Sequence, residues 1–276
     1  MNKMNETIVL LESRSIITLS GPERKSLLQG IITNNTEHLD NEQGLYAALL
    51  TPQGKYLHDF FLYQREEVIY LDCEKERMPD LFRRLLMYRL RKNVEIIDQS
   101  EKYKIVSSNT QLQNQPLSYQ DPRSKEMGYR TILETIPQGL KIEPEDEYHR
   151  RRIALGIAEG SMDYIVDKSL ILEGNFELLN GVDFKKGCYV GQEVTARMKY
   201  RGKVKKIMLP VTLSGPAPDK GTPITNEKGN KIGDLRSHCD KKAIALLRLG
   251  DIKFNQQYSC GDIKITPVKP LWWKET

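Results

Sequence analysis

Apolar and polar residues alternate along the first part of the chain, as they do in strands with one buried face. The alternation covers residues 7–19 and returns over 44–63, where a Pro52–Lys55 turn separates two apolar runs and predicts a hairpin. Further short strands are predicted at 68–72, 94–97 and 104–107.

Helical spacing appears in three segments. After Ser20, which can cap a helix, apolar residues recur at positions 27, 28, 31 and 32. A clearer stripe runs over 78–91, with Pro79 where a first turn tolerates it. A third helix opens near Pro144 with acidic residues in its first turn. Residues 109–128 are rich in Asn, Gln, Pro and Ser, so we expect a loop or a junction between subdomains there.

The pattern changes after residue 206, where short strand-like runs alternate with Gly and Pro turns. Residues 227–230, Glu-Lys-Gly-Asn, are typical of a hairpin turn. About 70 residues of short strands predict a small closed barrel, so we place a domain boundary near 203–207. The predicted barrel strands are 206–213, 222–226, 231–236, 243–249 and 263–268.

Length and composition narrow the class of protein. The 276 residues suggest two domains, and no apolar run approaches the roughly 20 residues of a spanning helix, so no membrane partner is expected. The first six residues lack a signal peptide, which predicts a cytoplasmic protein, or a matrix protein in a mitochondrion although no transit peptide is seen. Cysteines 73, 188, 239 and 260 show no close pairing, which indicates free thiols.

The net charge of +5 is modest but uneven, because residues 199–206 form a dense basic run. Tyr200 is the one aromatic residue in this run, and single-strand binders use interleaved aromatic residues for stacking, so nucleic acid is not the expected partner. The chain has no Cys-x-x-Cys, His-Glu-x-x-His, P-loop or Gly-x-Gly-x-x-Gly motif. We therefore expect no resident metal. Cys73, Cys239 and Cys260 are interpreted as structural or incidental.

The segment Lys-Gly-Cys-Tyr-Val-Gly-Gln-Glu at 186–193 concentrates groups that need hydrogen bonds or water, which makes it a poor core segment. Cys188 precedes a possible helix start and has Lys185, Lys186 and Arg197 nearby, an electropositive setting that favours thiolate. The glycine spacing is not that of a nucleophile elbow. The residues alone leave it open whether Cys188 is functional.

Two carboxylates lie within apolar runs. Asp59 stands among strand residues, and Glu173 follows Leu170-Ile171-Leu172. Such an acid either points outward or faces a ligand pocket. In a pocket it could hydrogen-bond the ring NH and amino group of a heterocycle such as a pterin.

The string at 186–193 resembles the signature of the YgfZ family. These proteins are folate-binding relatives of the glycine-cleavage T-protein, an aminomethyltransferase, and are implicated in iron–sulfur cluster assembly or repair. The resemblance extends over nearly the whole chain, through segments 19–24, 28–34, 51–55, 152–157 and 180–184.

The resemblance implies an α+β, T-protein-like ring of modules around a central folate cavity, with a small C-terminal β-barrel. Residues 1–204 would form two intertwined modules joined near 109–128, and 205–276 the barrel. It also implies that the side chains in contact with tetrahydrofolate are Asp59, Glu173, Tyr63 and Arg197. The family's first hairpin carries two adjacent acids, and His58 stands here in place of the first. The family's usual proline before Glu173 is replaced by Ile171-Leu172.

The leading functional hypothesis is a tetrahydrofolate-binding accessory protein for assembly or repair of iron–sulfur clusters. Its partners would be folate and iron–sulfur client or assembly proteins, with no permanently bound metal. Cys188 would be the functional thiol, within a motif formed by Lys186, Gly187, Tyr189, Gly191, Gln192 and Glu193.

Two alternatives remain. An active aminomethyltransferase would use Asp59 and Glu173, but it needs a carboxylate that steers a proton at the folate nitrogen, and His58 cannot replace one in charge or reach. The transferases also lack the cysteine motif. An RNA-binding or tRNA-modification module would use the basic run 199–206.

Overall fold

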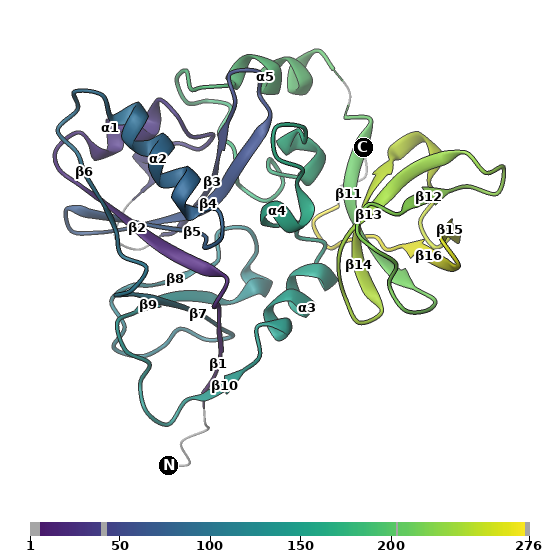
Figure 1. Ribbon diagram of the computed structural model, residues 1–276, viewed down its shortest axis with the longest axis horizontal. Coiled ribbons are helices and arrows are strands. Elements are labelled where there is room, and N and C mark those ends of the chain that lie inside the picture. The colour runs from purple at the N-terminus through teal and green to yellow at the C-terminus, as the bar shows by residue number, and fades with distance from the viewer. Residues whose placement is uncertain (1–5, 40–42, 203, 274–276) are drawn as a thin grey trace.

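The part of the chain that the structure describes contains two five-stranded sheets and a closed six-stranded barrel (Figure 1). The computed structural model describes residues 6–39, 43–202 and 204–273. The sheets pack against each other on one side of the molecule, and the barrel lies on the other side (Figure 1). This arrangement confirms the predicted α+β class with a C-terminal barrel.

The first sheet has the order β3-β4-β5-β2-β6 and is antiparallel throughout. The predicted hairpin is β3 and β4, and the helix predicted over 78–91 is α2, with Pro79 in its first turn. The α1 and α2 helices cover one face of this sheet, where Leu27, Leu28, Leu81 and Leu85 are buried. The elements are β2 (Arg14–Ser20), α1 (Arg24–Gln29), β3 (Leu45–Leu50), β4 (Tyr56–Arg65), β5 (Val68–Glu74), α2 (Met78–Arg89) and β6 (Glu95–Asp98), with a 3-10 turn η1 (Thr36–His38).

The second sheet has the order β10-β1-β7-β9-β8. The prediction that 109–128 is only a loop or junction is wrong for Ser118–Gln120, which form β8 and pair with β9. This strand is short, and its polar surroundings hide it in the sequence, but Tyr119 is buried and stacks on Tyr63 at 4.7 Å between ring centroids. The other elements are β1 (Thr7–Leu10), β7 (Lys104–Ser108), η2 (Lys125–Met127), β9 (Tyr129–Leu133) and β10 (Lys141–Glu143).

The barrel closes in the order β11-β14-β13-β12-β15-β16. All five predicted barrel strands form, whereas the three residues of β15 carried too short a pattern to be predicted. The predicted turn holds Gly229 at φ +77°, a left-handed conformation that glycine adopts without strain. The elements are β11 (Lys206–Leu213), β12 (Pro223–Thr225), β13 (Lys231–Cys239), β14 (Lys242–Arg248), η4 (Leu249–Asp251), β15 (Tyr258–Cys260) and β16 (Ile263–Pro267).

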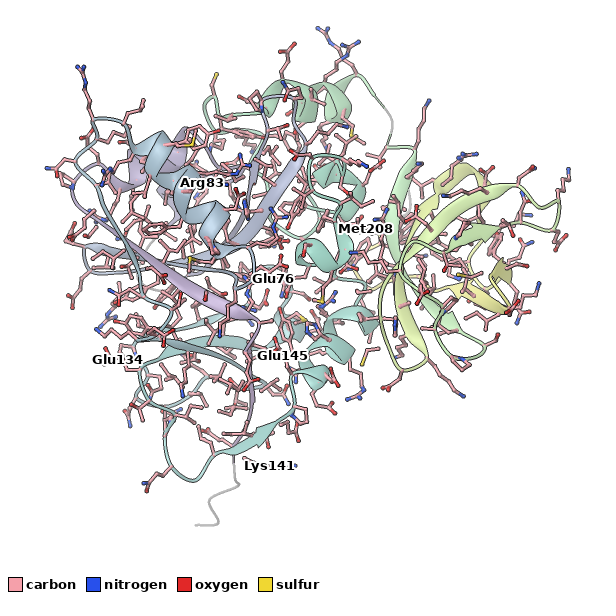
Figure 2. All side chains as sticks on the ribbon, in the orientation of Figure 1. Glu76, Arg83, Glu134, Lys141, Glu145 and Met208 are labelled. Atoms are coloured by element: carbon pink, nitrogen blue, oxygen red, sulfur yellow. The ribbon has the colours of Figure 1, made fainter. Side chains whose placement is uncertain are left out.

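Short helices connect the sheets to the barrel. The predicted third helix is α3 (Asp146–Ala154), and α3 and α4 (Gly160–Asp163) lie between the sheets and the barrel (Figure 1). Met208 of β11 reaches back into the core between the sheets, and Figure 2 labels it at this junction. A turn η3 (Ile171–Gly174) and the helix α5 (Gln192–Tyr200) precede the barrel.

None of the helices within the described residues has both the length and the apolar character needed to cross a membrane. The division of the chain at 204/205 remains a prediction, with β11 beginning at Lys206.

Candidate functional site

The segment at 186–193 is held against the turn of the β3–β4 hairpin by two glycines. Gly191 precedes α5 at φ +83°, and a Cβ added to it would lie 2.5 Å from the Thr51 carbonyl oxygen. A Cβ added to Gly54 would lie 2.8 Å from Cβ of Val194 and 3.0 Å from the Gly191 carbonyl oxygen. Only glycine allows both backbones to approach this closely. Two segments 140 positions apart therefore form one surface.

Lys186 fastens the same segment to the end of α1. Its ammonium donates hydrogen bonds to the carbonyl oxygens of Gln29 (2.8 Å), Ile32 (2.7 Å) and Asn34 (2.8 Å). These are orphan acceptors at and beyond a helix C-terminus, where a cation is favoured. Burial lowers the pKa of Lys186 to about 8, while the three carbonyl acceptors favour the protonated form. Lys186 is thus a structural anchor.

Thr33 and Asn34 connect α1 to the segment that leads into the motif. The Thr33 hydroxyl donates to the Gly181 carbonyl oxygen at 2.7 Å, and the Thr33 carbonyl oxygen accepts from the Asp183 amide at 3.1 Å. The Asn34 amide donates to the carbonyl oxygens of Tyr46 and Asn180, both at 2.7 Å. The segments 28–34, 51–55, 180–184 and 186–193 therefore converge on one place in the fold.

Cys188 is exposed at this place and is a free cysteine. It lines an open hollow of about 900 Å³ together with Pro52, Glu193, Arg197 and Arg201. The α5 helix begins at Gln192, so its N-terminal end faces this side of the motif. An exposed thiol in a hollow that two arginines also line can approach a partner without any rearrangement of the core.

The structure corrects two expectations about the motif. The segment is not wholly solvated, because Lys186, Tyr189 and Gly191 are buried. Of the three cations expected around Cys188, only Arg197 lines its hollow, because Lys186 is turned toward α1 and Lys185 lines a different cavity. Arg201, which sequence reasoning did not single out, supplies the second positive charge.

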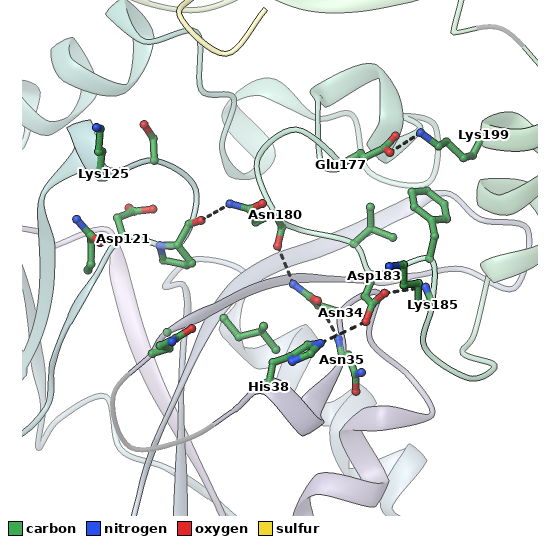
Figure 3. Close-up of a pocket in the computed structure, with 18 of the residues that line it drawn as sticks. Asn34, Asn35, His38, Asp121, Lys125, Glu177, Asn180, Asp183, Lys185 and Lys199 are labelled. Atoms are coloured by element: carbon green, nitrogen blue, oxygen red, sulfur yellow. Dashed lines mark hydrogen bonds and ion pairs between the residues drawn. The ribbon is translucent and has the colours of Figure 1, made fainter. Parts of the chain in front are cut away.

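A larger polar cleft of about 1260 Å³ lies on the other side of the motif (Figure 3). Asn34, Asn180 and Lys185 line it, and Lys199 forms an ion pair with Glu177 at its edge. Tyr200 lines both the cleft and the Cys188 hollow, so the two depressions are adjacent.

Asp59 is enclosed between the sheets and does not point outward. The hydroxyls of Tyr46 (2.8 Å) and Tyr56 (2.6 Å) donate to its carboxylate, and the Gly160 amide donates at 3.2 Å. Tyr56 stacks on Tyr164, whose hydroxyl donates to the Gly174 carbonyl oxygen. Burial raises the pKa of Asp59, although Arg14 and the two tyrosine hydroxyls oppose it. We refer to this arrangement as the Asp59 cage.

His58 points to the opposite face of β4, as neighbouring strand residues do. Its Nε2 lies 2.9 Å from Oδ2 of Asp80 in α2. Burial lowers the pKa of His58 to about 4, so the ring is neutral at pH 7. His58, which stands where the family has the first of two adjacent acids, joins β4 to α2 on the face of the strand opposite to Asp59.

The other predicted folate contacts do not gather around one cavity. Tyr63 is buried between the sheets, where its ring stacks on Tyr119. Glu173 is half-buried in η3, and burial raises its pKa against the opposing fields of Lys206 and Lys55. Arg197 is exposed near Cys188. Asp59 and Glu173 line neither the Cys188 hollow nor the polar cleft.

Buried ion pairs surround Phe61 beside the Asp59 cage. The guanidinium carbons of Arg14, Arg123 and Arg130 lie 5.4, 4.6 and 3.9 Å from its ring centroid. Arg14 and Arg130 both pair with Asp72, and Arg123 pairs with Asp121 and Glu159. Burial alone would raise the pKa of Glu159, but these arginines hold it well below its usual range. No local sequence pattern predicted this interior ion cluster.

Within the described residues no three His, Cys, Asp or Glu side chains gather as a metal site. The residues that the sequence did not single out as functional were Thr33, Asn34, Pro52 and Arg201. Thr33, Asn34 and Pro52 lie inside segments that carried the family resemblance, which was the available signal. Arg201 lies in the basic run 199–206, which was connected only with the RNA-binding alternative.

Comparison with known proteins gives the chain its family. Residues 205–275 match the family "CAF17, C-terminal beta-barrel domain". Relatives called "Iron-sulfur cluster assembly factor IBA57 homolog, mitochondrial" are 34% identical in Neurospora crassa and 30% identical in Pyricularia oryzae. The first match covers 76% of this chain and 54% of the relative, so the chain spans about half of that protein. The second covers 87% of this chain and 71% of the relative. The mouse factor IBA57 is 28% identical, over 97% of this chain and 85% of its own length.

The fold is also that of a solved structure. The glycine cleavage system aminomethyltransferase T from Bartonella henselae superposes with a TM-score of 0.77 at 12% identity, over 98% of this chain and 86% of that one. The T-protein-like fold predicted from the sequence is therefore confirmed, and the likeness speaks for the fold alone. On the strength of the matched relatives, the chain belongs to the family of IBA57 iron–sulfur cluster assembly factors.

Proposed function

We propose that this protein is an accessory factor for the assembly or repair of iron–sulfur clusters in client enzymes, and that Cys188 is its working thiol. The observation that carries the proposal is the exposure of Cys188 on a segment whose neighbours are anchored. Lys186, Tyr189 and Gly191 fix the segment, so the thiol is presented at a constant position. The resemblance to the YgfZ family, which is implicated in iron–sulfur cluster assembly or repair, leads to the same proposal in a more specific form.

The chemistry is ligand exchange on a cluster that is cargo and not a resident group. Iron in such clusters is held by cysteine thiolates. A single exposed thiolate can take one coordination position while the partner supplies the others. Thiolate-ligated clusters carry net negative charge, and Arg197 and Arg201 line the same hollow to compensate it.

The test is restoration of cluster-dependent enzyme activity in a strain that lacks the protein. We expect Cys188→Ala to restore none, while Cys239→Ala restores wild-type activity. Cys239 is the matched control because it is a second free cysteine that is partly accessible. Restoration by Cys188→Ala at the wild-type level would remove the thiol from the function.

The residues of the Asp59 cage do not fit a bound pterin as they stand. Three donors already surround a carboxylate that is 2% exposed, and the stacked rings of Tyr56 and Tyr164 occupy the adjoining space. We propose that tetrahydrofolate requires this cage to open. Titration of tetrahydrofolate into wild type and Tyr56→Phe tests this, and tighter binding by the variant is the expected result. Equal binding by both would place any folate elsewhere.

The protein is expected in the same cellular compartment as its client enzymes. The relatives named above are mitochondrial, and we propose the cytoplasm for this chain in a bacterium, or the mitochondrial matrix in a eukaryote. Fractionation beside a cluster-containing enzyme would test this.

A further inference from the structure

The end of α2 and the loop after it form a basic surface with an apolar tip. Residues 81–94 contain five cations and no acidic residue. The cations are Arg83, Arg84, Arg89, Arg91 and Lys92, and Figure 2 marks Arg83 on α2. We call residues 83–92 the α2 basic tip.

Three large apolar side chains protrude among these cations. Leu90 is 84% exposed, Met87 68% and Leu86 36%. They lie on the solvent side of α2, because Leu81 and Leu85 on its other side are fully buried against the sheet. Isolated exposed apolar residues are common, but three within five positions among arginines indicate a contact surface.

The backbone at Leu90 strengthens this interpretation. Leu90 follows the last residue of α2 at φ +48° and ψ −114°, a positive-φ conformation that bulky residues rarely adopt. The conformation holds a leucine that is 84% exposed and takes no part in the hydrophobic core of the described residues. A strained backbone conformation that adds no packing to the protein core is an outlier that points to a function.

Most nearby acidic groups are already paired. Asp80 accepts from Arg83 at 2.5 Å and Arg84 at 2.8 Å, and Glu23 lies 3.6 Å from Lys92. Among the residues that the structure describes, Arg89 and Arg91 have no acidic partner. The α2 basic tip therefore carries charge that the protein does not neutralise itself.

We propose that the α2 basic tip docks the protein on the surface of an anionic lipid bilayer. A protruding apolar tip enters the boundary between headgroups and acyl chains, while arginines around it pair with lipid phosphates. A stable protein interface needs about 800 Å² per partner with complementary shape, and three protruding side chains supply little of that. The expectation of no membrane partner rested on the absence of a spanning stretch, and peripheral docking does not need one.

Docking through α2 leaves the Cys188 hollow free. Lys92 and Asn93 contact the N-terminal end of α1 at Ser26 and Glu23, whereas Lys186 binds the C-terminal end. The α2 basic tip and the motif thus lie at opposite ends of α1. The docking proposal stands independently of the thiol chemistry.

Flotation with vesicles tests the proposal. We expect the full chain to float with vesicles of phosphatidylcholine and phosphatidylglycerol, to stay behind with phosphatidylcholine alone, and to be released by salt. The double variant R89Q/R91Q should bind about 25-fold more weakly, since each cation near the surface contributes about 1 kcal/mol. Leu90→Ser should weaken binding about fivefold without affecting folding, because its side chain is exposed.

The matched control is K241Q/K242Q, which removes two exposed cations from the barrel and should bind like wild type. Circular dichroism establishes that each variant is folded. Equal binding to both kinds of vesicle, no binding by wild type, or unchanged binding by both R89Q/R91Q and Leu90→Ser would overturn the proposal. Binding of RNA or an acidic peptide by wild type without any vesicle binding would also overturn it.

Discussion

The interior between the two sheets and the surface around Cys188 hold similar kinds of side chain but use them differently. In the interior, Asp59, Asp72 and Glu159 are each bonded to tyrosines or arginines. Around Cys188, the buried ammonium of Lys186 donates to backbone carbonyl oxygens, and the thiol itself is exposed. Reactive groups that are fully bonded inside a core stabilise a fold, whereas a group left exposed on an anchored segment is available for chemistry.

The difference matters because the resemblance implied that Asp59 and Arg197, which lines the Cys188 hollow, both contact tetrahydrofolate. Asp59 carries the family's acid position but lies in a closed cage. Cys188 lies in a separate hollow with Arg197 and Arg201. The four predictions that follow separate the structural interior from the functional surface.

The largest effect is expected from Asp72→Asn. Asp72 is fully buried and accepts from Arg14 at 2.7 Å and Arg130 at 2.5 Å. Removing its charge takes the nearest acid from two buried arginines, which keep only Glu159 at 4.0 Å and Asp121 at 3.8 Å, and this should lower the free energy of unfolding by about 3–5 kcal/mol. Urea denaturation measures this. The exposed Asp262→Asn should change it by less than about 0.5 kcal/mol. Equal midpoints for the two variants would mean that the interior ion cluster is not structural.

The next effect concerns the contact between the motif and the hairpin. Gly191→Ala combines a left-handed φ with an overlap against Thr51, and should cost about 3 kcal/mol in the free energy of unfolding. Gly221 has a similar φ of +90°, and a Cβ added there would meet nothing within 4 Å. Gly221→Ala should therefore lower the free energy of unfolding by about 1 kcal/mol, through the backbone conformation alone. Thermal unfolding compares them. A difference near zero would show that the motif does not pack on the hairpin turn.

His58 gives the interior a pH dependence. Its pKa is about 4 in the folded chain and 6.5 when unperturbed, so the unfolded chain takes up a proton that the folded chain does not as pH falls from 6.5 to 4. The free energy of unfolding should therefore fall through this window, by about 3 kcal/mol at its lower end. Glutamine can keep a donor toward Asp80, so His58→Gln should flatten the fall, and the exposed His238→Gln should not. If the free energy of unfolding of His58→Gln still falls steeply between pH 6.5 and 4, groups other than His58 cause the pH dependence.

The smallest effect on stability is expected at Gly187. A Cβ there would meet nothing within 4 Å, so Gly187→Ala should change the free energy of unfolding by less than about 0.5 kcal/mol. Cluster-dependent activity in the deletion strain is the informative readout. A stable variant with lowered activity would mean that the open space beside Cys188 is used by a partner. Full activity would limit the functional surface to the side of Arg197.

Much of the fold followed from local patterns. The β3–β4 hairpin, α2 and five barrel strands have regular spacing and clear turn residues, so their positions could be predicted. The strands β8 and β15 could not, because three residues carry too little periodicity. Their stability comes from tertiary contacts, such as the stacking of Tyr119 on Tyr63.

The candidate site was predictable in its parts but not in its assembly. The motif at 186–193 and the turn at 51–55 were identified separately, and only the fold brings Gly191 against Gly54. The direction of His58 follows from strand alternation, which puts it on the face of β4 opposite to Asp59. The anchoring role of Lys186 could not be predicted from the sequence, because its three acceptors are backbone carbonyl oxygens at and beyond the end of α1.

The most direct test of the account compares Asp59→Asn with Cys188→Ser in the deletion strain, with cluster-dependent enzyme activity divided by the amount of soluble variant protein. Asparagine keeps the shape of a carboxyl whose pKa is raised by burial. The account predicts near wild-type activity per soluble molecule for Asp59→Asn and none for Cys188→Ser. Activity that is lost with Asp59→Asn and kept with Cys188→Ser would contradict it.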